Sequence, residues 1–162
     1  MRRARGFTLI ELLTIVAIMG ILVAASIPAF KSFNKSSGLK STALRIVTDL
    51  WLARQRAIAT SKPYSVIFDT VENEYIVFVD DGNGAQEDYA DGEIDLDEEI
   101  VLTRDLEEGY TLSEVDLDPE GVVIFLPKGT LKNGTTGGTI TIAKADQSRT
   151  IVIRPSGLCR MD

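Results

Sequence analysis

The first thirty residues place the strongest constraint on this chain, because they join a basic head to an apolar run of membrane length. Residues 12–30 contain no charged side chain. As an α-helix this run is about 28 Å long, close to the roughly 30 Å hydrocarbon core of a bilayer. Arg2, Arg3 and Arg5 precede it. The positive-inside rule therefore predicts a cytoplasmic N-terminus and export of the remainder of the chain.

One carboxylate, that of Glu11, lies immediately before the apolar run. A carboxylate within a membrane segment costs about 2.5–3.5 kcal/mol on insertion scales. A cleavable secretory signal, cut near the small residues Val23–Ser26, has no use for such a side chain. We therefore favour a retained anchor in which an opposite charge meets Glu11 after insertion.

Residues Gly6–Leu13, with the sequence GFTLIELL, resemble the class III signal of type IV pilins and of type II secretion pseudopilins. The resemblance implies that a prepilin peptidase cleaves between Gly6 and Phe7 and methylates the new N-terminal amine of Phe7. It also implies that Glu11 pairs with the N-terminal ammonium of a neighbouring subunit when the helices bundle into a filament. Glu11 is then the assembly residue.

Pro28 lies near the end of the apolar run. A proline inside a helix removes one backbone hydrogen bond and bends the helix. We predict a bend at Pro28, with the helix continuing through the polar residues 31–37. The alternative is that the helix ends before Lys31.

Residues 31–62 are predicted to form an amphipathic helix that covers one face of a sheet, because apolar side chains recur there at helical spacing. Lys62 and Pro63 are expected to end it. Arg54 and Arg56 are interpreted as solvated or ion-paired rather than functional. The predicted core-facing positions are Ala43, Leu44, Val47, Leu50, Trp51, the aliphatic stem of Arg54, Ala57 and Ile58.

The remainder of the chain, residues 63–162, is strand-like. Tyr64–Asp69 and Glu74–Val79 are rich in β-branched and aromatic residues, and the turn between them predicts a hairpin. One long helix followed only by strands predicts an α+β fold, with the helix packed on an antiparallel β-sheet. Further strands are predicted at residues 100–104, 110–112, 122–126, 139–142 and 150–154.

Four further motifs resemble the GspH/FimT family of minor pilins and pseudopilins. They are Leu52–Ile58, Phe125–Gly129, Ile151–Ile153 and Ser156–Gly157. The resemblance implies the pilin fold, with residues 1–6 as a cleaved leader and 7–30 as a transmembrane and filament-core helix. Residues 31–62 continue this helix into a periplasmic β-rich domain at 63–162.

This resemblance implies that the chain is a non-enzymatic minor pseudopilin that assembles into a type II secretion pseudopilus. The alternative is a minor type IV pilin that serves pilus assembly or DNA uptake. The implied partners are other pilin subunits, the prepilin peptidase and the inner-membrane assembly platform. The implied location is the bacterial inner membrane, crossed once, with the C-terminal domain in the periplasm. The sequence contains no histidine and shows no nucleophile elbow or phosphate loop, which argues against an enzyme.

The middle of the chain is strongly acidic, since residues 69–120 carry twenty acidic side chains and one basic one. Oxygen-rich loops hold Ca²⁺, so a calcium site is one interpretation of this segment. The alternative is a solvated acidic loop without metal, and the spacing does not follow the EF-hand template. No cofactor is otherwise expected. The candidate ligands are Asp80, Asp81, Asn83, Asp88 and Asp91.

Some FimT-type members are associated with DNA uptake through a glycine followed by two arginines. Here only Arg160 follows Gly157 at that place, and Arg154 is the other basic residue nearby. The acidic middle of the chain repels phosphate. We therefore expect no general nucleic-acid binding, with Arg154 and Arg160 as candidates for a small DNA contact.

The single cysteine, Cys159, excludes an intrachain disulfide, so the hydrophobic core must hold the domain together. Three interpretations of Cys159 stand: a buried small apolar residue, a free thiol, or the partner of a thiol on another chain. We favour the first.

Overall fold

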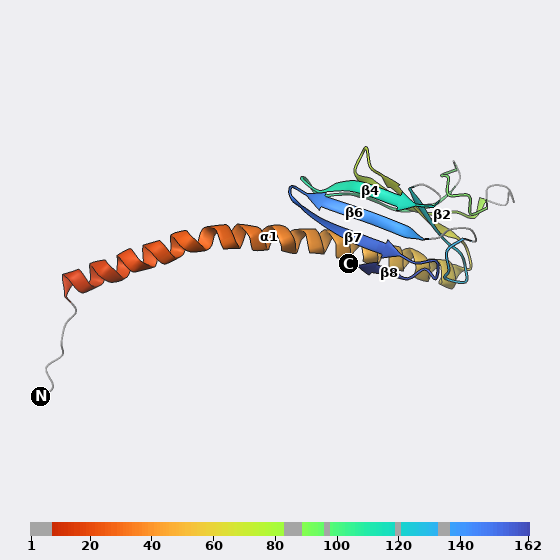
Figure 1. Ribbon diagram of the computed structural model, residues 1–162. Coiled ribbons are helices and arrows are strands. Elements are labelled where there is room, and N and C mark those ends of the chain that lie inside the picture. Colours follow the sequence, from red (N-terminus) through yellow and green to blue (C-terminus); the bar gives the residue numbers. More distant parts are fainter. Residues whose placement is uncertain (1–7, 83–88, 96–97, 119–120, 133–136) are drawn as a thin grey trace, which may run out of the picture. The chain divides into compact units, whose positions relative to one another are not determined.

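The computed structural model describes residues 8–82, 89–95, 98–118, 121–132 and 137–162, with the backbone alone at 26–36. The chain divides into two compact units, Met1–Ser37 and Gly38–Asp162. The second unit contains one helical segment and eight strands among these residues (Figure 1).

Helix α1 spans Leu9–Thr60. It continues through residues 31–37, so the alternative that the helix ends before Lys31 is wrong. The helix ends where predicted, because Ser61 adopts a positive φ of 56° and Pro63 follows. The bend at Pro28 stays a prediction.

The N-terminal unit carries the apolar run, and the described side chains from Leu9 to Ala25 are exposed. Among the described residues, no helix is long and apolar enough to cross a membrane.

The predicted α+β fold is confirmed, but the strands form two antiparallel sheets instead of one. The first sheet has the order β3-β2-β1-β5 and the second the order β4-β6-β7-β8; β4, β6, β7 and β8 lie side by side in Figure 1. Local sequence patterns do not encode strand order, which long-range pairing decides. The strands are β1 Tyr64–Asp69, β2 Glu74–Val79, β3 Ile100–Asp105, β4 Thr111–Leu117, β5 Val122–Phe125, β6 Gly138–Lys144, β7 Gln147–Ile153 and β8 Cys159–Met161.

The β1–β2 hairpin has the predicted bounds, and the carboxylate of Asp69 accepts the amides of Val71 and Glu72 in its turn at 2.7 and 3.0 Å. Four strands differ from prediction by more than one residue. β6 and β7 extend two and three residues further into the turn that joins them. β4 is longer, because a bulge between Leu112 and Glu114 shifts the alternation of inward and outward side chains. β8 was not predicted, since three residues are too few for a periodic pattern.

The core lies between α1 and the two sheets. The buried apolar helix residues alternate at spacings of four and three, which keeps one narrow stripe facing the sheets. They are Leu39, Ala43, Ile46, Leu50, Ala53 and Ala57. The prediction that Leu44, Trp51 and Ile58 also face the core is wrong: each follows a buried residue by one position, which rotates it about 100° toward solvent.

Candidate functional site

The start of α1 is fixed by a capping box formed by Thr8 and Glu11. The amide of Glu11 donates to Thr8 Oγ1 at 3.3 Å, and the amide of Thr8 donates to Glu11 Oε2 at 3.4 Å. The hydroxyl of Thr8 also donates to Glu11 Oε2 at 3.3 Å. This reciprocal arrangement satisfies backbone donors that the first helical turn leaves without partners.

Glu11 therefore has a role within its own chain that the sequence interpretation missed. The sequence does carry a signal for this role. A threonine followed three positions later by a glutamate, just before an apolar run, is the signature of a capping box, and Thr8 and Glu11 match it. A carboxylate in the first helical turn also interacts favourably with the helix dipole. Capping is thus a contribution of this side chain separate from the charge pairing that the sequence predicts for it. Gly6 and Phe7, the predicted cleavage residues, lie outside the described residues.

Three of the motifs used in the sequence analysis meet at one place in the C-terminal unit, which we call the motif junction. Arg54 of α1 donates its Nε proton to the carbonyl oxygen of Gly129 at 2.6 Å. Gly157, at a φ of +76°, packs with its Cα against the same carbonyl. The prediction that Arg54 is solvated or ion-paired is wrong for its Nε group, whose partner is a backbone carbonyl. The exposed Arg56 agrees with prediction.

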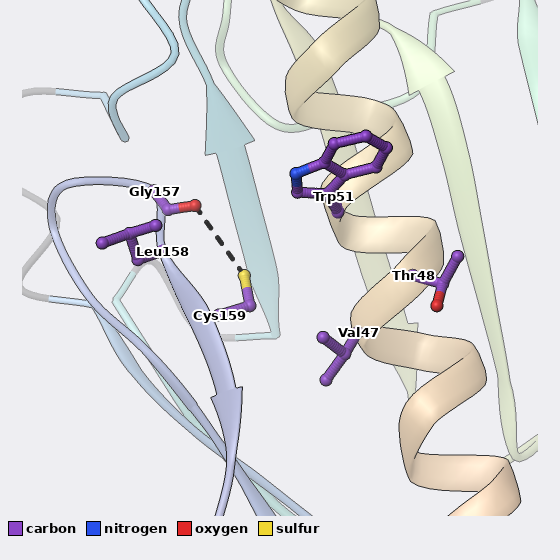
Figure 2. A pocket seen from close by; sticks show the side chains of 6 residues that line it. All are labelled: Val47, Thr48, Trp51, Gly157, Leu158 and Cys159. Atoms are coloured by element: carbon purple, nitrogen blue, oxygen red, sulfur yellow. Dashed lines mark hydrogen bonds between the residues drawn. The ribbon is translucent and has the colours of Figure 1, made fainter.

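Beside the motif junction lies an apolar cavity of about 200 Å³. Figure 2 shows Val47 pointing from the helix toward β8, with Trp51 on the same segment and Cys159 across the gap. Gly157 and Leu158 form its other wall. Cys159 is half-buried, and burial raises the pKa of its thiol to about 11, opposed by the charge of Arg54. The favoured interpretation of Cys159 as a small apolar residue fits this environment.

Asp49 forms a buried polar link between α1 and the first sheet. Its Oδ2 accepts the hydroxyl proton of Tyr75 at 2.7 Å and the Nε proton of Arg104 at 3.0 Å. Burial raises the pKa of Tyr75, and the hydrogen bond to Asp49 raises it further. Asp49 is not among the predicted core-facing positions, yet its side chain is buried because its partners come from β2 and β3.

We expect Asp49→Ala to lower the free energy of unfolding by about 1.5–3 kcal/mol, since it leaves a buried tyrosine hydroxyl without its charged partner. Unfolding by denaturant, followed by the fluorescence of Trp51, measures this change. Arg56→Ala, on an exposed position of the same helix, is the control and should stay within about 0.5 kcal/mol of wild type. Equal losses in both variants would contradict the role assigned to Asp49.

The acidic segment is held at its described ends by two carboxylates that accept backbone amides. Asp80 is fully buried; it accepts the amides of Asp91 at 3.1 Å and Gly92 at 3.0 Å, and the hydroxyl of Ser65. Glu98 accepts the amides of Gly82 and Asp95, each at 3.2 Å. These oxygens organise the loop instead of facing outward.

The calcium candidates do not form a cluster among the described residues. The carboxylate of Asp80 already accepts the hydrogen bonds described above. Asp81 pairs with Lys62 at 2.5 Å, and Asp91 accepts the amide of Glu93 at 2.9 Å. Asn83 and Asp88 lie outside the described residues. Within the part of the chain that is described, no group of three or more acidic or cysteine side chains is arranged to hold a metal ion.

Burial raises the pKa of Asp80 above its ordinary 3.8, and the hydrogen bonds from Ser65 and Gly92 oppose this shift in part. A carboxyl group whose folded-state pKa is raised contributes most to stability below its unfolded pKa, and this contribution is lost as the pH rises through the folded-state value. The stability of wild type minus that of Asp80→Asn should therefore decline as the pH rises from 3.8 through that value. Unfolding measured across this range tests the sign; a difference that grows with pH would contradict it.

The two arginines considered for DNA contact do not form a distinctive site. Arg160 pairs with Asp162 at 2.6 Å, and Arg154 is exposed at the end of β7. The carboxylate of Asp162 offsets the charge of Arg160, so this corner of the domain offers little net attraction for phosphate.

Comparison with known proteins decides the family. The profile described as type II transport protein GspH matches residues 42–157, which is more than half of the chain. The chain belongs to the GspH family. A second profile, the prokaryotic N-terminal methylation motif, matches residues 1–27. This GspH-family chain is also 32% identical over 105 residues to a fimbrial protein of Pseudomonas aeruginosa, covering 59% of this chain and 68% of that protein.

Solved structures support the fold of this GspH-family chain. The type IV minor pilin FimU of Pseudomonas aeruginosa is similar with a TM-score of 0.59 at 20% identity, covering 80% of this chain and 92% of that one. The minor pseudopilin EpsH of the type 2 secretion system of Vibrio cholerae is similar with a TM-score of 0.54 at 16% identity, covering 76% and 95%. The resemblance to the pilin fold is therefore confirmed. The family consists of pilin-like structural subunits.

Proposed function

We propose that this chain is a non-enzymatic minor pseudopilin that assembles through its N-terminal helix into a type II secretion pseudopilus. The match of the GspH profile to residues 42–157, together with the methylation motif at 1–27, carries this proposal. In this proposal the prepilin peptidase cleaves between Gly6 and Phe7 and methylates Phe7. The mature chain then joins other pilin-like subunits at an inner-membrane assembly platform.

The methylation motif supports an anchored N-terminus. We propose a single crossing of the bacterial inner membrane by the segment within residues 7–30, with the β-rich domain in the periplasm. Arg2, Arg3 and Arg5 would keep the leader in the cytoplasm. The uncharged run that follows them has the length that a crossing requires.

A minor type IV pilin is the second candidate, because a fimbrial protein and the minor pilin FimU are both similar to this chain. The acidic domain and the single arginine after Gly157 favour secretion over DNA uptake. A deletion strain assayed in parallel for secreted proteins, surface pili and transformation separates the candidates. Lost secretion with normal piliation is expected; intact secretion with lost piliation would favour the type IV pilus.

The processing step has its own test, which is the mass of the mature N-terminus. We expect a chain that begins at Phe7 and carries one added methyl group on its amine. A chain cut near Ser26, or left uncut, would contradict the proposal. Gly6→Val should block the cut and leave the full-length precursor in the membrane.

A further inference from the structure

The strands of the first sheet are apolar on both of their faces. β1, β2 and β5 contain the unbroken apolar runs VIF, YIVFV and VVIF. In the second sheet, by contrast, β6 has the alternating sequence GTITIAK. Alternation is typical of a strand with one face in water, whereas a continuous apolar run is typical of a strand that is covered on both faces. The first sheet therefore has the sequence of a sheet with a partner on each side.

The main core covers only one face of the first sheet. The side chains that enter this core from β1, β2 and β5 include Val66, Phe68, Tyr75, Val77 and Val123. Ile67, Ile76 and Val122 are not part of it. They alternate with the core residues and so lie on the opposite side of the sheet, which we call the outer face. Ile67 pairs with Ile76 on one side and Val122 on the other, so the three form an apolar row across the strands.

One end of the outer face is covered by the chain itself. Ile124 lies there and is fully buried, although it is outside the main core. Gly92 packs on the side chains of Ile124 and Val122, and the neighbouring Ala90 is buried. This cover ends at the apolar row, whose three side chains are only half-buried, so solvent still reaches them.

A row of carboxylates borders the apolar row on its other side. Asp69 pairs with Glu74, and Glu74 pairs with Asp105, so the three lie side by side across β1, β2 and β3. Like charges directly opposite one another destabilise a sheet. Partial burial raises the pKa of Glu74, and the charge of Asp105 and a hydrogen bond to it raise this pKa further. We call these three residues the acidic row.

The acidic row is not neutralised within the described part of the chain. None of its three carboxylates forms an ion pair there. The one basic residue in β1, β2, β3 and β5 is Arg104, and its Nε donates to Asp49 on the core side. The sheet therefore holds three negative charges beside apolar surface, at a cost to its own stability.

The covering segment adds a second acidic border. Glu93 is exposed and directly follows Gly92, which contacts Val122 at the end of the apolar row. Lys132 reaches the same segment, where its ammonium donates to the carbonyl oxygen of Ala90 at 2.6 Å. The apolar row thus lies between the acidic row on one side and Glu93 on the other.

This arrangement selects a partner that is both apolar and basic. A purely apolar partner would take the carboxylates out of water without a counter-charge, which is costly. A second copy that presents the same face would bring two acidic rows together. An amphipathic helix with basic side chains on both sides of its apolar stripe matches one apolar row between two acidic borders. The row from β5 to β3 is about 14 Å long, which equals about nine residues of helix.

We propose that the outer face of the first sheet binds a basic amphipathic helix of a partner protein, laid across the strands along the apolar row. Basic side chains of this helix pair with the acidic row on one side and with Glu93 on the other. The sheet then becomes a middle layer, with α1 on its core face and the partner helix on its outer face. This inference goes beyond the proposed function, because it assigns a binding surface to the β-rich domain.

Fluorescence anisotropy with a designed probe tests this surface. The full chain in micelles of a neutral detergent is titrated against a labelled helical peptide of leucine and lysine, with the leucines on one face. A twin peptide with glutamate in place of lysine keeps the apolar stripe and reverses the charge, and micelles without protein give the background. We expect the lysine peptide to bind, and the glutamate peptide to bind at least about tenfold more weakly, because like charges oppose docking.

Two variants of the outer face should weaken binding of the lysine peptide. Glu74→Gln combined with Asp105→Asn removes two charges with little change in shape, and should weaken binding about five- to tenfold. Ile76→Thr keeps a β-branched side chain in the strand and should weaken binding through lost apolar contact. Glu114→Gln is the matched control, because Glu114 is an exposed carboxylate on β4 of the other sheet. It should leave binding unchanged.

Photo-crosslinking locates the bound peptide. Thr103 is exposed and pairs with Ile76, so a crosslinking residue at position 103 should give adducts with the lysine peptide. The same residue at position 114 should give none. Equal binding of the two peptides, no binding of the lysine peptide, an equal loss in Glu114→Gln, or adducts from position 114 instead of 103 would each overturn the proposal.

Discussion

Replacing Glu11 with glutamine is expected to abolish assembly while leaving prepilin cleavage and the start of α1 intact. Glutamine at this position still completes a capping box with Thr8. It cannot neutralise the N-terminal ammonium of a neighbouring subunit, which is the partner that we predict for Glu11. Removing one partner from a buried ion pair costs about 3–5 kcal/mol, which is a loss of at least about a hundredfold in assembled subunit. The fraction of subunit that sediments with assembled material measures this loss.

Two matched variants separate the pairing role of Glu11 from its capping role. Thr8→Ala removes the capping hydroxyl but keeps the carboxylate, so assembly should persist with a more frayed helix start, at a cost of about 1 kcal/mol. Glu11→Ala removes both contributions and should assemble no better than Glu11→Gln. Normal assembly of Glu11→Gln combined with poor assembly of Thr8→Ala would assign Glu11 to capping alone.

Replacing Gly157 with alanine adds only one methyl group, but it is expected to lower the free energy of unfolding of this domain substantially. Gly157 adopts a φ of +76°, where an L-residue is strained by about 1–2 kcal/mol. The added methyl group would also collide with the carbonyl oxygen of Gly129 and lie 2.9 Å from Arg54 Nε. Relieving that collision costs about a further 1–3 kcal/mol, since Arg54 and the loop must move.

Gly109→Ala isolates the backbone contribution. Gly109 has a similar φ of +83°, but the nearest atom to an added methyl group is Lys144 Cε at an ordinary 3.7 Å. This variant should lose only the strain of about 1–2 kcal/mol. Denaturant unfolding followed by Trp51 fluorescence compares the two. Equal losses would show that the motif junction is not tightly packed.

Several features of the fold were predictable from local chemistry alone. The bounds of β1 and β2 followed from two runs of β-branched and aromatic residues around a polar turn. The end of α1 followed from Pro63, because proline restricts the residue before it. The family followed from Gly6–Leu13 and the motifs near residues 54, 129 and 157, since these combine unusual residue types in a fixed order.

Other features depended on which partners the fold brought together. Asp49 has the sequence pattern of a surface residue, but β2 and β3 supply Tyr75 and Arg104 as hydrogen-bond donors. Asp80 has the sequence pattern of a calcium ligand, but its oxygens accept amides from its own loop. Trp51 was predicted to lie in the core, because a periodicity of 3.6 does not distinguish adjacent positions when both are apolar.

The sequence by itself determined the methylation motif, the long helix and the family, because each depends on residues that are neighbours in the chain or one helical turn apart. The tertiary structure alone decided the division into two sheets, the meeting of Arg54 with Gly129 and Gly157, and the exposure of Leu44, Trp51 and Ile58. These depend on pairing between segments distant in sequence. Which of two adjacent apolar residues a helix buries is settled only by the surface that it packs against.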